Sequence, residues 1–434
     1  MEWYLILLIA GIALICLIML GMPIAFSLGA VALGLGYIFV GQRIFFLFGS
    51  IAYAKTNEFG LVAVPLFIFM AEILIESGAA RDAFLTLNKW IGALPAGLAI
   101  ASQMGCTLFA AVCGASTATT AVVGGMCVPE MIDRGYDKRL ATGSIAAGGA
   151  LGVLIPPSIL LIIYGIIAQT SIGQLFIAGI IPGILLVAWR VAYFLVLAKA
   201  KPEKAPRGPR CSWRVRVLSL WRILPLFGLA IFMIGALYAG MATPSEVAGV
   251  GAFISIVICA SYRKLNWKVL RESLQKTART TCFILWILVA ASAFGYVFSY
   301  LQVPQNLVKW VTGLGINRYL VIIGINFMLF VLGCVMDPAA IIMVTVPIFA
   351  PMIQAMGFDL VWFGIMFVVN MELAEITPPL GLNLYIMKAV APPEVTLNDI
   401  ILGAVPFMIL DMVGLSMIII WPGIVMWLPS LMMT

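Results

Sequence analysis

Hydrophobicity is the feature that most constrains how this chain can fold. Of its 434 residues, 63% are hydrophobic and only 10% are charged. A typical soluble domain is about 45–50% apolar and about 25% charged. A water-soluble protein of this length could not bury so much apolar surface, so most of the chain must be surrounded by lipid. We therefore expect an all-α polytopic membrane protein, which excludes a soluble enzyme, a nucleic-acid-binding protein and a disordered scaffold.

Side chains that carry out catalysis are scarce. The sequence contains no histidine, which excludes a Ser-His-Asp triad, an H-E-x-x-H zinc site and a histidine proton relay. Its eight cysteines are scattered and form no C-x-x-C pair, so we interpret them as small apolar residues rather than as disulfides or metal ligands. We predict that the protein is not an enzyme. An intramembrane enzyme is a weak alternative, because the residues of the known intramembrane protease and acyltransferase chemistries are missing.

The sequence contains a weak internal duplication. Lys89-Trp90 recurs as Lys309-Trp310, 220 residues later, and Arg43 matches Arg263 at the same spacing. Proline positions follow in the same order at spacings of 221 to 224 residues: Pro23 with Pro244, Pro156-Pro157 with Pro378-Pro379, and Pro182 with Pro406. Five matches in one order predict two repeats, residues 1–200 and 223–434, joined by the linker 199–222.

The distribution of charge predicts the orientation of these repeats. The linker 199–222 carries eight Lys or Arg residues against one Glu, and the loop 263–279 carries six against Glu272. Both segments should be cytoplasmic, because basic loops remain on that side of the membrane. The weakly charged N-terminus, C-terminus and loop 42–58 should then be periplasmic. Each repeat must cross the membrane an odd number of times, so the two repeats should be inverted relative to each other.

Each repeat is expected to hold about five membrane spans and one re-entrant hairpin. The segments 94–129 and 319–353 contain too many Gly, Pro, Ser and Thr residues for ordinary spans, and we interpret them as the hairpins. The acidic N-terminus lacks the features of a cleaved signal peptide and is expected to be a retained helix. The predicted spans are 4–21, 24–41, 59–79, 140–168, 176–198, 223–241, 244–262, 280–301, 362–390 and 400–421.

Four interruptions of the apolar segments occupy matching places in the two repeats. They are CGASTAT (113–119), GVLIPPS (152–158), GCVMDPAA (333–340) and EITPPLGLN (375–383). Pro156-Pro157 and Pro378-Pro379 remove amide donors and break their helices, which leaves carbonyl groups without partners inside the membrane. These carbonyls and the neighbouring hydroxyls suit a hard cation, and the freed helix N-termini suit an anion. Matching interruptions in inverted repeats indicate the binding site of a secondary transporter.

Acidic residues within apolar segments are further candidates, because an ionisable group in a membrane is costly. Asp337 lies at the second hairpin tip, 221 residues after Ser116, and we interpret it as a cation ligand, with helix capping as the alternative. Glu372 and Glu375 precede the second Pro-Pro break, and Glu375 either lines the site or pairs locally. Asp411 and Glu246 are expected to be structural, and Glu72 and Glu76, four residues apart on one helix face, would form a subunit or domain contact.

Apart from Arg190, no Lys or Arg lies deep within a predicted span. We expect the Arg190 side chain to extend from a helix end to the membrane surface. An organic anion at the midplane would therefore have no arginine partner. Its charge would be balanced by co-bound cations and helix N-termini, which favours obligatory cation coupling.

The segments CGASTATTAVVGGMCVPEM, GALGVLIPPSILLIIYG and ELAEITPPLGLNLY resemble the large membrane subunit of TRAP transporters (tripartite ATP-independent periplasmic transporters, DctM-like). The resemblance extends over essentially the whole chain. It implies an elevator-type secondary transporter of the ion transporter superfamily in the bacterial inner membrane. Residues 1–79 would belong to its scaffold, and residues 94–168 and 319–390 to its mobile transport domain.

The resemblance also implies what the protein transports and with which partners. Uptake of a small organic acid anion would be driven by sodium without ATP. A periplasmic substrate-binding protein would deliver the substrate, and a small four-helix membrane subunit would accompany this chain. Two sodium sites are implied, one formed by Ser116, Thr117, Gly152 and Ile155 and the other by Gly333, Asp337, Thr377 and Gly381. The substrate would lie near Thr119, Ser158 and Asn383.

Two other kinds of transport protein are considered. A stand-alone cation-coupled carboxylate carrier of the same superfamily, without a binding protein, fits the physical features of the sequence equally well, and only the family motifs favour the tripartite system. A channel fits less well, because re-entrant tips in inverted repeats suit alternating access.

Overall fold

A computed structural model describes residues 2–432, and all regular structure in this range is helical, in twenty α-helices and three short 3₁₀ helices. The first half of the chain forms α1 (Trp3–Met19), α2 (Ile24–Val40), α3 (Arg43–Thr56), η1 (Phe59–Val62), α4 (Ala63–Ser77), α5 (Ala79–Ile91), α6 (Gly97–Cys113), α7 (Ser116–Asp133), α8 (Lys138–Leu151), η2 (Gly152–Leu154), α9 (Ile159–Ala168), α10 (Ile172–Ala200) and η3 (Pro202–Lys204). The second half forms α11 (Trp213–Tyr238), α12 (Pro244–Ser261), α13 (Trp267–Tyr300), α14 (Val303–Gly313), α15 (Arg318–Gly333), α16 (Pro338–Ala355), α17 (Leu360–Glu375), α18 (Leu382–Val390), α19 (Leu397–Ile420) and α20 (Gly423–Leu431).

Many of these helices have the length and composition of membrane spans. Among the described residues, seven helices are long and apolar enough to cross a bilayer, and eight if α8 with η2 and α9 are counted as one bent span. The predicted spans 4–21 and 24–41 correspond to α1 and α2, which are apolar helices of 17 residues. Large apolar side chains such as Leu8, Ile12 and Ile15 are exposed on the outside of α1, as expected for a surface that faces lipid. The helix content, the span lengths and the exposed apolar side chains confirm the prediction of an all-helical, polytopic membrane protein.

Several segments predicted as loops are helical. The predicted loop 42–58 is mostly the helix α3, the loop 263–279 contains the first turns of α13, and the linker 199–222 includes the end of α10 and the start of α11. Three further helices, α5, α14 and α20, were not predicted at all. The search for spans overlooked these segments because it required long apolar runs, whereas a short amphipathic helix at the membrane surface needs only one apolar face.

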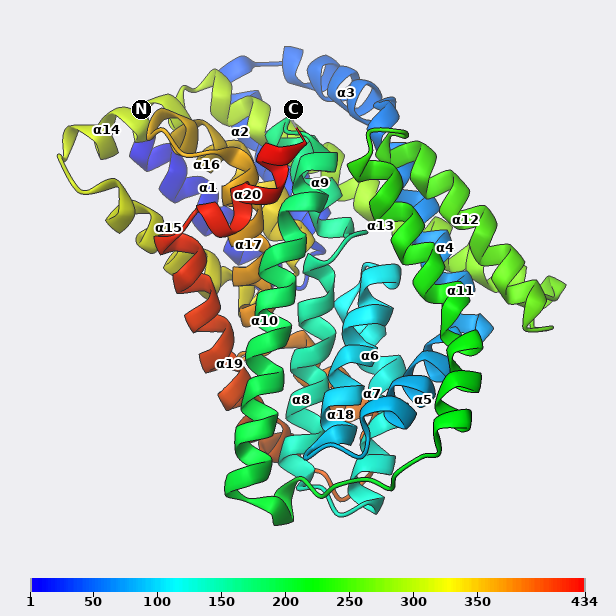
Figure 1. Ribbon diagram of the computed structural model, residues 1–434. Coiled ribbons are helices and arrows are strands. Elements are labelled where there is room, and N and C mark those ends of the chain that lie inside the picture. Colours follow the sequence, from blue (N-terminus) through cyan, green and yellow to red (C-terminus); the bar gives the residue numbers. More distant parts are fainter. Residues whose placement is uncertain (1, 433–434) are drawn as a thin grey trace.

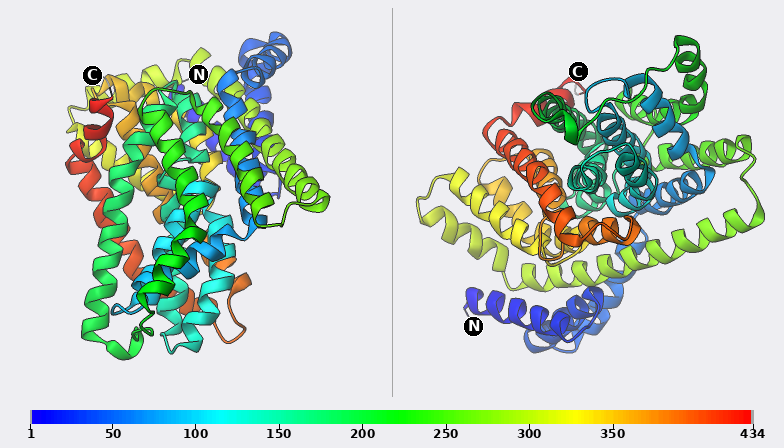
Figure 2. Two further views of the ribbon diagram at one scale, coloured as in Figure 1. Left: turned by 45° about the vertical axis from the view of Figure 1, so that its right-hand side comes forward. Right: turned by 90° about the horizontal axis from the view of Figure 1, so that it is seen from below.

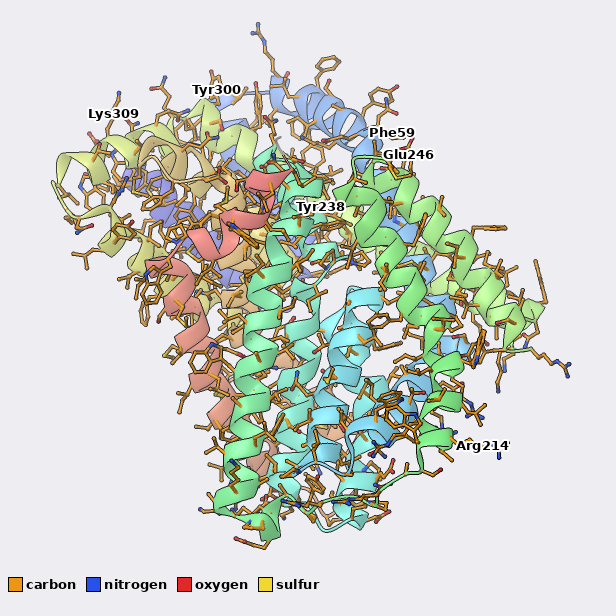
Figure 3. The ribbon with its side chains drawn as sticks, in the orientation of Figure 1. Phe59, Arg214, Tyr238, Glu246, Tyr300 and Lys309 are labelled. Carbon is orange, nitrogen blue, oxygen red and sulfur yellow. The ribbon has the colours of Figure 1, made fainter. Side chains whose placement is uncertain are left out.

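The helix pairs that contain the Pro-Pro breaks run in opposite directions. In Figure 1, α8 lies at the lower end of the molecule and leads to α9 at the upper end, whereas α17 lies at the upper end and leads to α18 at the lower end. The linker between α10 and α11 lies at the lower end, and α1 and α20 lie near the upper end. Figure 3 shows the same polarity within α11, with Arg214 low and Tyr238 high. Residue 1 and residues 433–434, which belong to the termini predicted to be periplasmic, lie outside the described residues.

Two close helix contacts hold the elements around these breaks together. Glycines lie at the crossing of α8 and α19, where a Cβ atom on Gly143 would collide with the backbone at Gly403, and one on Gly403 with the backbone at Arg139. Farther along α19, Asp411 accepts hydrogen bonds of 2.8 and 2.7 Å at its two carboxylate oxygens from the Nη2 atom of Arg190 on α10. Both side chains are buried, with 0% and 1% of their surface exposed.

The expectation that Arg190 extends to the membrane surface is therefore wrong. The helix α10 ends at Ala200, between Lys199 and Lys201, but Arg190 lies several turns before this end and on a buried face of the helix. Burying a guanidinium group is costly unless it is paired, and Asp411 supplies the partner. This contact also gives Asp411 the structural role that the sequence favoured for it.

The other acids expected to be structural also have contacts within this chain. Lys276 of α13 lies 3.3 Å from Glu72 and 3.2 Å from Glu76, both on α4. Glu246 forms a capping box with Thr243 at the start of α12. Glu72 and Glu76 therefore join two helices of one chain, and Glu246 stabilises a helix end.

Candidate functional site

The tip of the first hairpin lies against the first Pro-Pro break. Gly114 joins α6 to α7 with a φ of +66°, a conformation that favours glycine. A Cβ atom at this position would also lie 3.1 Å from the carbonyl oxygen of Pro157. The break itself bends α8 with η2 against α9 by 42°. Glycine at the tip and proline at the break thus bring two irregular backbone segments together.

The second hairpin and the second break make a corresponding contact. The Leu380 amide donates a hydrogen bond of 3.2 Å to the carbonyl oxygen of Cys334, which joins the break to the hairpin tip. Gly381 precedes α18 with a φ of +43°. Both Pro-Pro bonds, Pro156-Pro157 and Pro378-Pro379, are cis. Each half of the chain therefore places a helical hairpin tip beside an unwound segment.

One cavity of about 160 Å³ joins elements of the two halves. It brings together the first hairpin tip, residues near the first break, the start of α16 and the end of α17. Three of the predicted sodium ligands, Ser116, Thr117 and Asp337, line it. The remaining lining residues are Gly114, Ala115, Val153, Ile159, Leu160, Thr280, Phe283, Ile284, Pro338, Ala339 and Glu375.

The charged groups of this cavity are both acidic. Asp337 and Glu375 line it, and no Lys or Arg is among its lining residues. The Ser116 side chain neighbours the Glu375 carboxylate, and Asn383 donates a hydrogen bond of 3.4 Å to Glu375 Oε2. Glu375 therefore does both things that the sequence left open, since it lines the cavity and pairs locally. Two carboxylates without a basic partner give the cavity a strong preference for a cation.

Asp337 also caps a helix. Its Oδ1 atom accepts hydrogen bonds from the amides of Ala339 (2.9 Å) and Ala340 (3.4 Å) at the start of α16. Among the described residues, no hydrogen bond is made to Oδ2. The capping contact is thus present, and it leaves one carboxylate oxygen free for a ligand in the cavity that Asp337 lines.

The other predicted sodium ligands lie outside the lining of the cavity, four of them in the two broken segments and Gly333 at the end of a hairpin helix. The Gly152 carbonyl accepts a hydrogen bond of 3.3 Å from Ile155, and the Thr377 hydroxyl donates one of 2.7 Å to Leu373. Gly333 is buried at the end of α15, and Gly381 is the N-cap residue that precedes α18. Their assignment as ligands through backbone oxygens stays a prediction.

The three predicted substrate residues are all buried. Two of their side chains bond within their own helix: the Thr119 hydroxyl donates to Ala115, and Ser158 caps α9 by accepting from Leu161. Asn383 differs, because its Oδ1 atom is buried without a hydrogen-bond partner. None of the three lines the cavity, so their role in binding substrate also stays a prediction.

One wall of the cavity could not be predicted from the sequence. Thr280, Phe283 and Ile284 of α13 line it opposite the hairpin tips. This helix has no Pro-Pro break, and Arg279, which precedes Thr280, belongs to the basic segment that the sequence analysis interpreted as a loop, so no local pattern identified these residues as part of a site. These residues could be identified only from the structure, because α13 and the hairpin tips are far apart in the sequence.

Comparisons with known proteins agree on one kind of protein. Residues 12–424 match the family model described as "Tripartite ATP-independent periplasmic transporter, DctM component". The chain is 34% identical over 383 residues to the C4-dicarboxylate TRAP transporter large permease protein DctM of Pseudomonas aeruginosa, covering 87% of this chain and 88% of that one. It is 31% identical over 394 residues to the isethionate TRAP transporter permease protein DctMQ of Oleidesulfovibrio alaskensis, covering 90% of this chain but only 62% of that longer one.

A solved structure shares the fold. The YdaH transporter of Alcanivorax borkumensis superposes with a TM-score of 0.63 at 15% sequence identity, covering 89% of each chain. At this identity the likeness concerns the fold alone.

Proposed function

The chain belongs to the DctM family of tripartite ATP-independent periplasmic transporters, and we propose that it is a sodium-coupled permease that imports a small organic acid anion by an elevator movement. Its relatives are named as permease proteins of transporters, so the chain is a transport component and not an enzyme. The observation that carries the proposal is the cavity in which Ser116, Thr117, Asp337 and Glu375 meet without a basic residue.

Sodium fits the chemistry of this cavity. A hard cation prefers oxygen ligands, and the cavity offers carboxylate and hydroxyl oxygens next to two unwound backbone segments. In a membrane protein, two uncompensated carboxylates are costly, and a bound cation removes most of that cost. The residues around each break would bind one sodium ion, as the resemblance implies for Ser116, Thr117, Gly152 and Ile155 and for Gly333, Asp337, Thr377 and Gly381.

The names of the relatives and the partial positive charge of four helix N-termini support an anionic substrate. The two relatives described above are named for C4-dicarboxylate and for isethionate, which are both small organic anions. Four helices, α7, α9, α16 and α18, begin at the hairpin tips and breaks, and their N-termini carry partial positive charge. Bound sodium and these N-termini would together balance the anion, with Thr119, Ser158 and Asn383 as its nearest polar groups. Coupling to sodium is then obligatory, because the anion would otherwise face Asp337 and Glu375 alone.

The arrangement of the helices supports inverted repeats and an elevator movement. The pairs α8–α9 and α17–α18 run in opposite directions, as two inverted copies would (Figure 1). The unit that contains α6, α7, α8 and α18 extends beyond α4 and α12 toward the linker end of the molecule, as Figures 1 and 2 show. We interpret α6–α9 and α15–α18 as the transport domain and α1–α4 and α11–α13 as the scaffold. The displacement toward the linker then corresponds to the inward-facing state.

Partners and location follow from the family. The name of the family describes a tripartite, periplasmic system, and we propose a periplasmic substrate-binding protein and a small four-helix membrane subunit as its other two components. The chain would lie in the bacterial inner membrane with the linker in the cytoplasm and both termini in the periplasm. A stand-alone carrier is the alternative, and omission of the binding protein distinguishes the two.

Labelling of Cys211 tests this topology. Cys211 lies in the linker and is partly exposed, so a membrane-impermeant maleimide should label it only after the cytoplasmic side is opened. A matched control is Lys309→Cys in a Cys211→Ser background, because Lys309 is exposed at the opposite end of the molecule (Figure 3). This control should be labelled in intact spheroplasts. Labelling of Cys211 in intact spheroplasts would contradict the assigned orientation.

Uptake by proteoliposomes tests the function. We expect a panel of small organic acids, presented with the binding protein and the small subunit, to yield one that accumulates under an inward sodium gradient. Replacing sodium by potassium or choline should reduce this accumulation to background. Accumulation that is equal in all three salts would refute sodium coupling, and accumulation without the binding protein would favour the stand-alone carrier.

A further inference from the structure

A cluster of three buried ionisable groups lies apart from the cavity. It consists of Arg190 on α10, Asp411 on α19 and Glu372 on α17. Glu372 is only 2% exposed, and it interacts electrostatically with Asp411, with Arg190 and with Glu375 on its own helix. The proposed sodium and substrate sites assign no role to Glu372.

The hydrogen-bond donors and acceptors of this cluster are incompletely used. The Arg190 Nη2 atom binds both oxygens of Asp411, but its Nε and Nη1 atoms are buried without a partner. Both carboxyl oxygens of Glu372 are likewise buried without a hydrogen-bond partner. The amide of Leu154 approaches Glu372 without reaching hydrogen-bond geometry. Unused donors on Arg190 and unused acceptors on Glu372 therefore lie in one buried cluster.

The charges of the cluster do not balance if every group is ionised. One guanidinium and two carboxylates would leave a net charge of minus one in the packed interior of a membrane protein, where an uncompensated charge is strongly unfavourable. Asp411 already pairs with Arg190 through both oxygens, so the excess negative charge belongs to Glu372.

A proton is the cation that fits this place. A sodium ion needs several oxygen ligands, whereas Asp411 is occupied by Arg190 and Glu372 offers only its own two oxygens. A proton needs only one carboxylate oxygen.

We propose that the carboxyl group of Glu372 is a proton-binding site that completes an electroneutral cluster with Arg190 and Asp411. A neutral cluster avoids an uncompensated charge in the low-dielectric interior of the protein. Glu372 can also replace Asp411 as the partner of Arg190. If Asp411 is neutralised, Glu372 can release its proton and pair with the unused N–H groups of Arg190. The proposal concerns α10, α17 and α19 and does not depend on sodium coupling.

Infrared spectroscopy of the purified permease in liposomes at neutral pH tests this proposal. The wild-type spectrum should contain the C=O stretch of a buried, protonated carboxylic acid, and the Glu372→Gln variant should lose it. Glu246→Gln is the matched control, because Glu246 is exposed in a capping box and should be ionised. The control should keep the wild-type band. Survival of the full band in Glu372→Gln would show that the proton is not on Glu372 and would overturn the proposal.

If Glu372→Gln fails to fold, a second variant tests the same proposal. Asp411→Asn removes the present partner of Arg190, so Glu372 should lose its proton to restore the pair, and the acid band should again disappear. The double variant Asp411→Asn with Glu372→Gln leaves Arg190 without any anion, and its thermal stability should fall by much more than the sum of the two single changes. An acid band that persists in Asp411→Asn, or additive stability effects, would contradict the proposed exchange.

Discussion

Replacing Pro156-Pro157 by Ala-Ala is expected to abolish substrate uptake while leaving the protein folded and inserted. Two alanines restore two amide donors and favour a continuous helix, whereas the structure bends by 42° between η2 and α9. A continuous helix would return the freed carbonyls to helical hydrogen bonds. A carbonyl that contacts a charged group contributes about 1.5–3 kcal/mol. The loss of two such ligands would lower sodium affinity by at least about a hundredfold.

The chain provides a matched control for this change. A third proline pair, Pro392-Pro393, lies in the loop between α18 and α19, away from the cavity. Pro392-Pro393→Ala-Ala makes the same chemical change and should retain substantial uptake. Comparable surface expression of the two variants, measured together with uptake, separates a defect in transport from a defect in insertion. Wild-type uptake by the Pro156-Pro157 variant would show that the broken helix is not required.

Neutralising Asp337 should weaken sodium activation without unfolding the protein. Asparagine is as good an N-cap as aspartate, so Asp337→Asn keeps the bonds to Ala339 and Ala340 and removes only the negative charge. We expect the sodium concentration for half-maximal uptake to rise at least about tenfold, which corresponds to about 1.4 kcal/mol of binding free energy. Uptake measured over a range of sodium concentrations at saturating substrate gives this value.

Asp359 provides the control for this prediction. It caps α17 in the same way, through bonds to Val361 (2.6 Å) and Trp362 (3.3 Å), but does not line the cavity. Asp359→Asn should leave sodium activation unchanged. An unchanged sodium dependence in both variants would mean that Asp337 only caps its helix.

The sequence was most informative where local chemistry determines structure. The apolar composition predicts helices, and the Pro-Pro pairs and glycines predict the breaks and hairpin tips, since each of these effects acts within a few residues. The structure has η2 and the bend at Pro156-Pro157, and Gly114 adopts the positive φ that the tip requires.

Features that depend on contacts between distant segments could not be predicted in the same way. Arg190 and Asp411 are 221 residues apart, and nothing near either residue indicates that they pair. Thr280 contributes to the cavity only because α13 packs against α16 of the second hairpin. The helix α3 was missed for a different reason, because its 14 residues are too few for the long apolar run that identifies a span.

Direct binding of radioactive sodium to the purified permease, without substrate or partner proteins, is the measurement closest to the central claim. If the cavity between the hairpin tips holds sodium, wild-type protein and Asp359→Asn should bind it saturably. Binding to Asp337→Asn and to the Pro156-Pro157 variant should be much weaker. Equal binding by all four proteins, or no saturable binding to any of them, would contradict the assignment of this cavity as a sodium site.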